Sequence, residues 1–297
     1  MDVPTIPARS IVIKNKSTAW FGTRYTMNIY RGCSHGCIYC DSRSDCYGND
    51  RFDTVRAKEN ALFLLRGELR RKVKTGIVGT GAMSDPYNPF ERDLMLTRHA
   101  LELLAAYGFG AAIATKSELI ERDIDVLQEI AQAAPVLCKV TVTTADDALC
   151  RKIEPHVSVS SRRLEAVARL SQAGIFTGLL MMPVLPFLED SPENILGIVR
   201  RAKEAGARFI YPALGMTLRQ NQRDWYFEKL ETLFPGENLA ERYRRRYGNS
   251  YECRCPGLPA LWKLFSEECD RLGILYQMKD IVRASRAGYA AEQISLF

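Results

Sequence analysis

Residues 25–211 alternate between six short β-rich runs and five amphipathic stretches. The amphipathic stretches begin at Lys58, Asp93, Asp123, Ser160 and Ser191, and several end at glycine, as helices commonly do. Regular alternation of this kind predicts parallel βα units, arranged as a doubly wound sheet or as a full or partial barrel. In either arrangement, functional side chains collect at the carboxyl ends of the strands. The predicted strands cover residues 25–30, 76–80, 110–115, 137–143, 175–181 and 207–211.

The alternation stops near residue 215, which divides the chain into four segments. Residues 1–24 form an N-terminal extension, and residues 25–215 form the α/β domain. Residues 216–288 are predicted to be a helical extension, with helices that have no strands between them. Residues 289–297 are predicted to be a flexible tail.

Composition limits the classes of protein to which the chain can belong. No apolar run approaches the roughly 20 residues that span a bilayer, and the N-terminus lacks the basic-then-apolar layout of a secretory signal. We therefore expect a cytoplasmic protein with no membrane partner. The formal net charge of +6 permits a polyanionic partner without requiring one.

Three of the nine cysteines, Cys33, Cys37 and Cys40, lie within eight positions after the first predicted strand. A structural zinc site usually takes four protein ligands, and here a fourth would have to be Cys46 or a distant thiol. Three thiolates alone suit a [4Fe–4S] cluster that keeps one iron open for another molecule. The other cysteines are scattered, and Cys138 is predicted to be a buried apolar residue. Packing or a free thiol is the favoured interpretation of Cys253, Cys255 and Cys269, with a second cluster as the alternative.

The spacing C-x3-C-x-aromatic-C, formed by Cys33, Cys37, Tyr39 and Cys40, resembles the signature of the radical S-adenosylmethionine (SAM) superfamily. The resemblance implies a partial (β/α)6 barrel of the TIM type, which the six predicted strands fit independently. It also implies that SAM chelates the open iron of a [4Fe–4S] cluster. An electron from a donor such as flavodoxin or ferredoxin would then cleave SAM to a 5′-deoxyadenosyl radical, which abstracts hydrogen from a substrate.

Further motifs over residues 25–215, including "GTGAMSDPYNPFE" and "MMPVLPFLED", resemble the spore photoproduct lyase-like branch, whose members are often labelled DNA repair photolyases. The resemblance implies several contacts with SAM. Asp85 has an equally weighted alternative as a turn residue before proline, and Arg163 has one as an exposed helix residue. Tyr39 would lie between the cluster and the adenine, with plain aromatic packing as the alternative. The implied SAM-binding residues are Tyr39, Ser84, Asp85, Lys116, Thr143 and Arg163.

Two positions depart from spore photoproduct lyase itself. That family uses a cysteine and a tyrosine as hydrogen carriers, and this chain has Ala82 and Asp41 at the matching places. Neither side chain donates a hydrogen atom readily, so we do not expect authentic spore photoproduct repair. Cys46 is the substitute hydrogen donor that the sequence offers, and the catalytic residues otherwise stay unknown. His35, inside the cysteine loop, is predicted to face solvent.

Evidence for a nucleic-acid substrate comes from the helical extension. The segment "ERYRRRYG" places arginines beside tyrosines, so that guanidinium groups could neutralise phosphates while tyrosines stack on bases. A solvated helix face is the alternative. The candidate nucleic-acid contacts are Arg242, Tyr243, Arg244, Arg245 and Arg246.

The last five residues resemble the pentapeptide by which bacterial repair and replication enzymes bind the sliding clamp. Gln293 would supply an amide anchor, and Ile294, Leu296 and Phe297 would supply apolar contacts. The leading hypothesis is thus a radical SAM enzyme that acts on damaged or modified nucleic acid. A radical SAM enzyme for a peptide or small molecule is the second hypothesis, and a non-catalytic iron–sulfur redox sensor or binding protein is the third.

Overall fold

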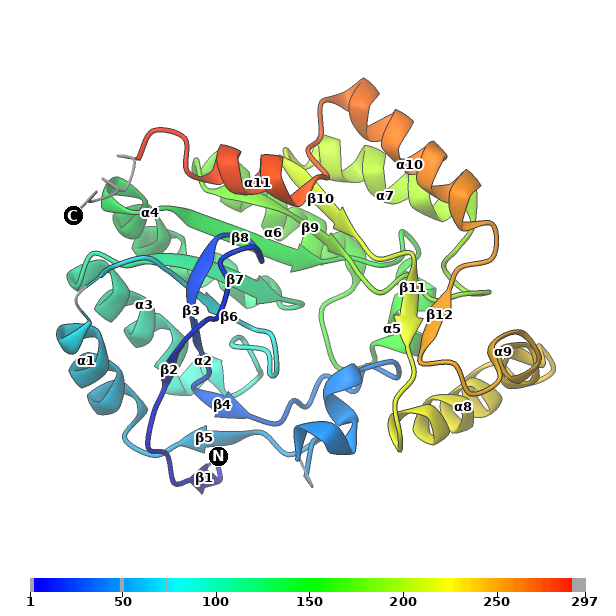
Figure 1. The fold of residues 1–297 in the computed structure, drawn as a ribbon, viewed down its shortest axis with the longest axis horizontal. Coiled ribbons are helices and arrows are strands. Elements are labelled where there is room, and N and C mark those ends of the chain that lie inside the picture. The colour runs from blue at the N-terminus through cyan, green and yellow to red at the C-terminus, as the bar shows by residue number, and fades with distance from the viewer. Residues whose placement is uncertain (1–2, 49–50, 73, 290–297) are drawn as a thin grey trace.

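A seven-stranded sheet forms the centre of the computed structural model, which describes residues 3–48, 51–72 and 74–289. Its strand order is β10-β9-β8-β7-β6-β3-β2, and all neighbouring pairs are parallel except β2 with β3. Six parallel strands in sequence order, with β10 and β2 as the two edge strands of this described sheet, make a partial (β/α)6 barrel, as predicted (Figure 1). The strands are β2 (Val12–Lys14), β3 (Thr23–Met27), β6 (Ile77–Thr80), β7 (Gly110–Thr115), β8 (Val136–Thr141), β9 (Phe176–Met181) and β10 (Phe209–Pro212).

Helices follow the parallel strands and cover the outer face of the sheet. At the start of α7, the Ser191 hydroxyl accepts a hydrogen bond from the backbone N–H of Asn194, and Pro192 occupies the first turn, as the sequence predicts. The main helices are α1 (Ala61–Arg71), α3 (Leu96–Ala106), α4 (Ile124–Ala133), α6 (Ser160–Gln172) and α7 (Pro192–Glu204). Shorter ones are α2 (Glu91–Leu94), η3 (Glu118–Asp123) and α5 (Asp147–Ile153).

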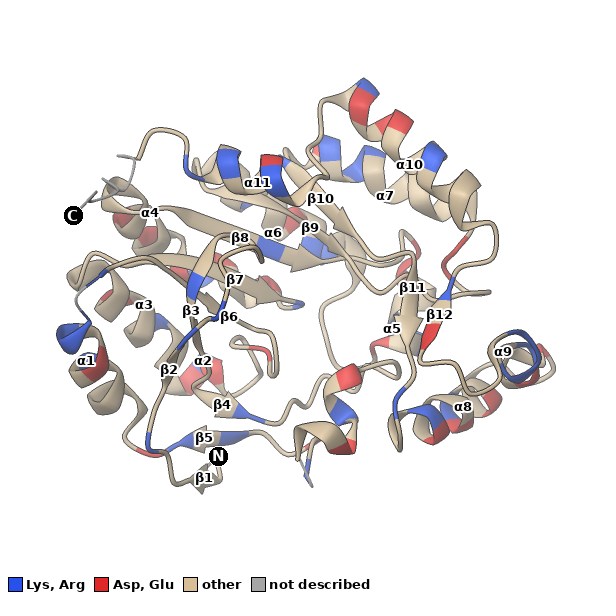
Figure 2. Ribbon diagram, in the orientation of Figure 1, with Lys and Arg blue, Asp and Glu red and all other residues tan. Residues whose placement is uncertain are grey.

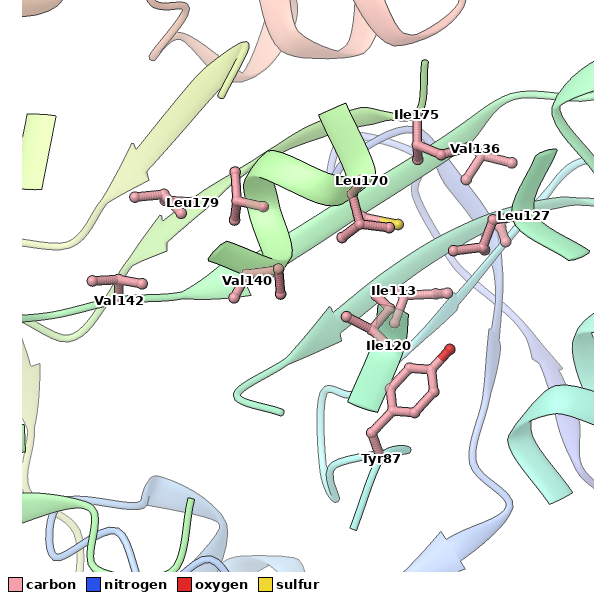
Figure 3. Packing of buried hydrophobic residues seen from close by; sticks show 14 of the residues in the cluster. Tyr87, Ile113, Ile120, Leu127, Val136, Val140, Val142, Leu170, Ile175 and Leu179 are labelled. Atoms are coloured by element: carbon pink, nitrogen blue, oxygen red, sulfur yellow. The ribbon is translucent and has the colours of Figure 1, made fainter. Parts of the chain in front are cut away.

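Side chains of β8 alternate between the two faces of the sheet, because successive residues of a strand point to opposite sides. Val136, Cys138 and Val140 belong to the core between the sheet and the helices (Figure 3). Cys138 is fully buried there, as predicted. Leu137 belongs instead to a smaller cluster on the inner face of the barrel, together with Phe21. The barrel therefore has an apolar outer core and a separately packed interior.

The predicted strand over residues 25–30 is divided between two sheets. Residues up to Met27 belong to β3 of the main sheet, and a small second sheet has the order β1-β5-β4. The N-terminal 24 residues are also more than an extension, because they contribute β2 to the main sheet. The small sheet consists of β1 (Thr5–Ile6), β4 (Tyr30–Arg31) and β5 (Arg56–Lys58).

The segment after residue 215 is mainly helical, but the prediction of helices without intervening strands is wrong at one place. Strand β12 (Glu252–Arg254) lies between two helices and pairs antiparallel with β11 (Gly215–Thr217). Helix α10 packs against α7, and Ile281 of α11 joins the interior cluster of the barrel (Figure 1). The helices are α8 (Gln222–Leu233), α9 (Leu239–Tyr247), α10 (Leu258–Leu272) and α11 (Met278–Ser285). The predicted clamp-binding residues 293–297 lie outside the described residues.

None of the helices in the described part of the chain combines the length and the hydropathy that a bilayer-spanning segment requires.

Candidate active site

The loop that carries the three clustered cysteines follows β4 and is fixed by backbone hydrogen bonds. The N–H of Cys33 donates to the carbonyl of Phe52 at 2.7 Å, and the N–H of Ile38 donates to the carbonyl of Ile153 at 3.0 Å. Gly32 has a φ of 80°, and a Cβ there would lie 2.2 Å from the carbonyl oxygen of Thr54. The loop therefore needs glycine at this position.

The three thiols lie close enough to affect one another electrostatically. Burial, followed by the nearby Asp85 carboxylate, raises the pKa of Cys33 to about 12. Burial also raises the pKa values of Cys37 and Cys40, and the negative charges of Cys40 and Cys33 raise that of Cys37 further. Three mutually repelling thiolates need a cationic partner if they are all to ionise, so the donor set suits a positively charged metal centre.

The number of clustered thiols favours a cluster over a structural zinc ion, which usually takes four protein ligands. Among the described residues, no three Cys, His, Asp or Glu side chains lie close enough together to hold one metal ion. A [4Fe–4S] cluster takes its thiolates on separate irons, so three cysteines leave one iron open. Cys46, the possible fourth ligand, is exposed on η2 (Asp45–Tyr47), where its Sγ lies 3.4 Å from Ser44 Oγ.

A buried ion pair stands behind Tyr39. Arg163 is fully buried and donates hydrogen bonds to the carboxylate of Glu154 and to the carbonyl of Thr141, the latter at 2.9 Å. The Tyr39 hydroxyl donates to the same carboxylate. The alternative of an exposed helix arginine is therefore wrong, and the carboxylate that Arg163 reaches belongs to Glu154. The role of Glu154 could not be predicted from the sequence, because it depends on contacts with residues distant in the chain.

Lys116 ends β7 beside the cysteine loop. Its Nζ lies 5.7 Å from the centre of the Tyr39 ring. Although burial opposes it, the negative charges of Cys37 and Glu154 raise the pKa of the Lys116 ammonium. The lysine therefore stays protonated next to the thiols, which suits a partner for a carboxylate.

Asp85 joins the cysteine loop to the end of β7. Its carboxylate accepts hydrogen bonds from Thr115 Oγ1 at 2.7 Å and from the backbone N–H groups of Lys116 and Tyr87 at 2.7 and 2.9 Å. The bond from Tyr87 makes Asp85 a turn residue, in line with the alternative reading of its sequence. His35 Nδ1 lies 3.6 Å from the same carboxylate.

His35 is only 4% exposed, so the prediction that it faces solvent is wrong. Burial lowers its pKa. Ser84, next to Asp85, donates from its hydroxyl to the carbonyl of Tyr30 at 3.1 Å. Ser84 and Asp85 thus hold the segment after β6 against the cysteine loop.

Thr143 follows β8 and donates from its hydroxyl to Glu189 at 2.6 Å. Glu189 also accepts from the N–H of Leu185 at 2.8 Å, and burial raises its pKa to about 8. Sequence reasoning did not single out Glu189, because nothing local marks a buried acid within "PFLED". Both Thr143 and Glu189 are fully enclosed by the protein.

Two cavities meet at this end of the barrel. One, of about 510 Å³, lies between the cysteine loop at Tyr39 and Cys40 and the β11–β12 pair. The other, of about 280 Å³, lies inside the barrel and is lined by Asp85 and Lys116. Ala82 and Met182 line both cavities. Of the predicted cluster and SAM residues, Tyr39, Cys40, Asp85 and Lys116 line one or the other of these adjoining cavities.

Asp41, which the sequence analysis matches to a radical-carrying tyrosine of spore photoproduct lyase, is anchored by hydrogen bonds to other residues. Its carboxylate accepts hydrogen bonds from Arg219 Nε at 2.8 Å, Thr217 Oγ1 at 3.1 Å and the Tyr47 hydroxyl at 2.8 Å. These contacts fasten η1 (Asp41–Arg43) to the segment that begins with β11. An ion-paired carboxylate cannot carry a hydrogen atom, which agrees with the sequence analysis.

The candidate nucleic-acid helix α9 is only partly suited to the predicted role. Arg242, Arg244, Arg245 and Arg246 are all exposed, and Figure 2 shows the basic residues along this helix. Tyr243 is fully buried, and its hydroxyl lies 2.9 Å from both the Pro186 carbonyl and the Tyr226 hydroxyl. The prediction that Tyr243 stacks on bases is therefore wrong. It holds α9 onto the protein and leaves only the arginines available to phosphates.

The cysteines of the C-terminal segment pack in the protein interior. Cys253, Cys255 and Cys269 are all buried free thiols. Cys255 Sγ lies 3.4 Å from the carbonyl of Val184, and Cys269 belongs to the main core. These contacts agree with the predicted packing role.

A partial (β/α)6 barrel with three cysteines after its first parallel strand is an architecture typical of iron–sulfur enzymes. The sequence profile described as "Radical SAM superfamily" matches residues 27–197 of the chain. The chain therefore belongs to the radical SAM superfamily, whose cofactors are a [4Fe–4S] cluster and SAM, and these are its cofactors. Reductive cleavage of SAM also requires an electron donor.

Similar proteins come from bacteria and archaea. An uncharacterized protein of Mycobacterium tuberculosis is 34% identical over 246 residues, which cover 80% of this chain and 72% of that protein. An uncharacterized protein of Methanocaldococcus jannaschii is 31% identical over 179 residues, covering 59% of this chain and 66% of that protein.

The fold is similar to that of spore photoproduct lyase complexed with dinucleoside spore photoproduct. The TM-score is 0.61 at 14% identity, and the match covers 85% of this chain and 75% of that one. The radical SAM methyltransferase TsrM of Kitasatospora setae, with cobalamin and a [4Fe–4S] cluster bound, gives a TM-score of 0.57 at 12% identity. That match covers 88% of this chain and 60% of TsrM.

Proposed function

We propose that this protein cleaves SAM reductively and acts on damaged or modified nucleic acid, and that it is not an authentic spore photoproduct lyase. The observation that carries the proposal is a pair of adjoining cavities that share Ala82 and Met182 as lining residues, one lined by Tyr39 and Cys40 of the cysteine loop and the other by Lys116. When bound, the cluster supplies the electron that breaks a carbon–sulfur bond of SAM. The protein must hold the cluster, orient SAM and admit the substrate.

The chain's own residues divide these tasks. Cys33, Cys37 and Cys40 would hold the cluster, with one iron left for SAM. The ammonium of Lys116 suits the carboxylate of SAM, because the negative charges of Cys37 and Glu154 raise its pKa although burial lowers it. The Glu154–Arg163 pair acts indirectly, by fixing the Tyr39 ring between the cysteine loop and the barrel. Ser84, Asp85 and Thr143 would border the cofactor, although their side chains are already hydrogen-bonded within the protein.

Two observations favour nucleic acid as the substrate. The fold is similar to that of an enzyme complexed with a dinucleoside. The exposed arginines of α9, of which Arg242 lies over the Phe187 ring and Arg244 over the Phe227 ring, offer cations to a phosphate backbone. A base would have to leave its stack to reach the barrel interior. The ion-paired Asp41 and the methyl group of Ala82 argue against spore photoproduct itself, because neither can return a hydrogen atom.

A peptide or small-molecule substrate is the second candidate, since the fold also resembles that of TsrM, which has been solved with tryptophan as substrate. Irradiated DNA and peptides can be compared in one assay of 5′-deoxyadenosine formation after anaerobic purification. We expect about four irons per chain, a brown colour and dithionite-dependent product that irradiated DNA increases. A stimulation by peptides alone would favour the second candidate. Colourless protein loaded with zinc would contradict the whole proposal, and a cluster without SAM cleavage would favour a redox sensor.

Electrons would enter at a groove behind the cysteine loop. A cavity of about 670 Å³ is lined by Ser34, Gly36 and Ile38 of that loop and by Arg151, Lys152 and Lys229, with Asp53 as its acidic member. The excess of basic side chains suits an acidic electron carrier such as flavodoxin or ferredoxin. Changing Lys152→Glu should slow SAM cleavage driven by reduced flavodoxin and leave cleavage driven by dithionite unchanged. Equal loss with both reductants would contradict this docking site.

A further inference from the structure

Lys139 lies in the middle of β8 on the inner face of the barrel. Its neighbours in the sheet are Ala114 of β7 and Gly178 of β9, so that no large side chain flanks it. The residue is 4% exposed and lines the 280 Å³ cavity. Sequence reasoning treated this segment only as an apolar strand, so the lysine has no role in the site described above.

The ammonium of Lys139 lacks a counter-charge. Within residues 3–48, 51–72 and 74–289, Nζ forms no hydrogen bond and no ion pair, and it lies 4.6 Å from the centre of the Phe21 ring. Burial lowers the pKa of this lysine to about 8, although the neighbouring thiol of Cys138 opposes the shift. A buried charge of this kind is costly unless an anion approaches it.

The same cavity contains further groups that suit a polar ligand. Thr141, two residues along β8, lies on the same face and also lines the cavity. The Asp85 carboxylate, which lines the cavity as well, is already held by Thr115 and by the N–H groups of Lys116 and Tyr87. The cavity therefore presents one uncompensated positive charge deep inside the barrel.

Lys139 and Lys116 occupy different depths. Ala114 pairs with Lys139, so Lys116 lies two residues nearer to the carboxyl ends of the strands, or about 7 Å along the sheet. If Lys116 takes the carboxylate of SAM, Lys139 stays available below it. We propose that Lys139 binds an anionic group of the substrate, a carboxylate or a phosphate, inside the barrel. The inference rests on the proposed function only in taking the barrel as the substrate site, and it holds for either substrate class.

Amine labelling of the cluster-loaded protein tests this site directly. Cyanate, a small reagent, carbamoylates neutral amines, and peptide mass spectrometry would measure the rate at Lys139 under anaerobic conditions at pH 8. Inorganic phosphate and succinate serve as the two anionic probes, with chloride at equal ionic strength as the reference. At ten times its Kd, a bound probe should slow labelling of Lys139 about tenfold.

Lys72 is the matched control, because its Nζ also lies over an aromatic ring, that of Tyr25 at 5.1 Å, but it does not line the barrel cavity. Its labelling should be the same in every solution. Protection of Lys139 by succinate alone would identify a carboxylate substrate, and protection by phosphate would identify a phosphorylated one. Protection by neither anion, or equal protection by SAM alone, would overturn the proposal.

Equilibrium dialysis of the same probes against variants gives an independent measurement. Lys139→Met should lose binding of the protective anion at least tenfold, whereas Lys139→Arg, which keeps the charge, should retain it. Iron content reports whether each variant keeps its cluster, so a folding defect is recognised without an activity assay. Unchanged anion binding by an iron-loaded Lys139→Met protein would contradict the proposal. If the wild-type protein binds the anion but does not cleave SAM, that result would contradict the proposed function and still support the anion site at Lys139.

Discussion

Replacing Lys139 by methionine should stabilise the protein at neutral pH when no anion is bound. The pKa of this lysine falls from 10.5 to about 8 in the folded state, and a difference of about 2.5 units corresponds to about 3 kcal/mol. Methionine fills a similar volume without a charge, but it loses the contact with the Phe21 ring, which contributes about 1 kcal/mol. The net expected gain in the free energy of unfolding is therefore about 2 kcal/mol.

The gain should depend on pH in a defined direction. Below pH 8 the lysine is protonated in both states, so the full cost of burial is present. Between pH 8 and 10.5 the unfolded chain binds the proton and the folded chain releases it, and the wild-type protein gains about 1.4 kcal/mol per pH unit. Above pH 10.5 both states are neutral and the cost disappears. The advantage of Lys139→Met should thus be constant below pH 8 and, shrinking by about 1.4 kcal/mol per pH unit, disappear near pH 9.5.

Thermal melting of cluster-loaded proteins at one scan rate measures this difference. About 2 kcal/mol should raise the melting temperature of Lys139→Met by roughly 4–8 °C at pH 7. The exterior control, Lys72→Met, should change it by less than about 2 °C at every pH, since surface substitutions are nearly neutral. A saturating anion should narrow the gap by stabilising the wild-type protein alone. A variant no more stable than wild type at pH 7, or a gap that persists at pH 10, would refute the reasoning.

Three further perturbations test the site and the tail. Arg163→Met should lower the free energy of unfolding by about 3–5 kcal/mol in urea titrations, because it leaves the buried carboxylate of Glu154 without its cation; a change below 1 kcal/mol would contradict the buried pair. Cys37→Ala should lose most of the bound iron, whereas the buried control Cys255→Ala should keep it, as iron analysis would show. Removing residues 293–297 should abolish retention by an immobilised sliding clamp and leave SAM cleavage intact, and loss of both would argue against a separate clamp-binding tail.

Much of the fold was predictable because its signals are local. The strand and helix alternation depends on hydrophobic periodicity within short windows, and the cap at Ser191 depends on two adjacent residues. The cysteine spacing indicated the cofactors in the same way, since one loop supplies all three ligands. The short strand β12 was missed because three residues carry too little periodicity, and its partner β11 lies about 35 residues earlier.

The surroundings of individual side chains could not be predicted in this way. Tyr243 sits in a run of arginines that looks solvated, yet contacts with Tyr226 and Pro186 bury it. His35 looks like a loop residue, but the segment after β6 brings Asp85 to it. In both cases the side chain is buried by segments that are distant in the sequence. Local composition therefore cannot predict the burial.

The sequence by itself determined that this protein is a radical SAM barrel, and it predicted the three cluster ligands and the absence of the hydrogen carriers of spore photoproduct lyase. Only the tertiary structure decided which charges are paired. It placed Arg163 against Glu154, tied Asp41 to Arg219 across 178 positions, and left Lys139 without a counter-charge beside Phe21. The physical reason is that the cost of a charge depends on the solvent and partners around it, and those are set when distant strands and loops pack together.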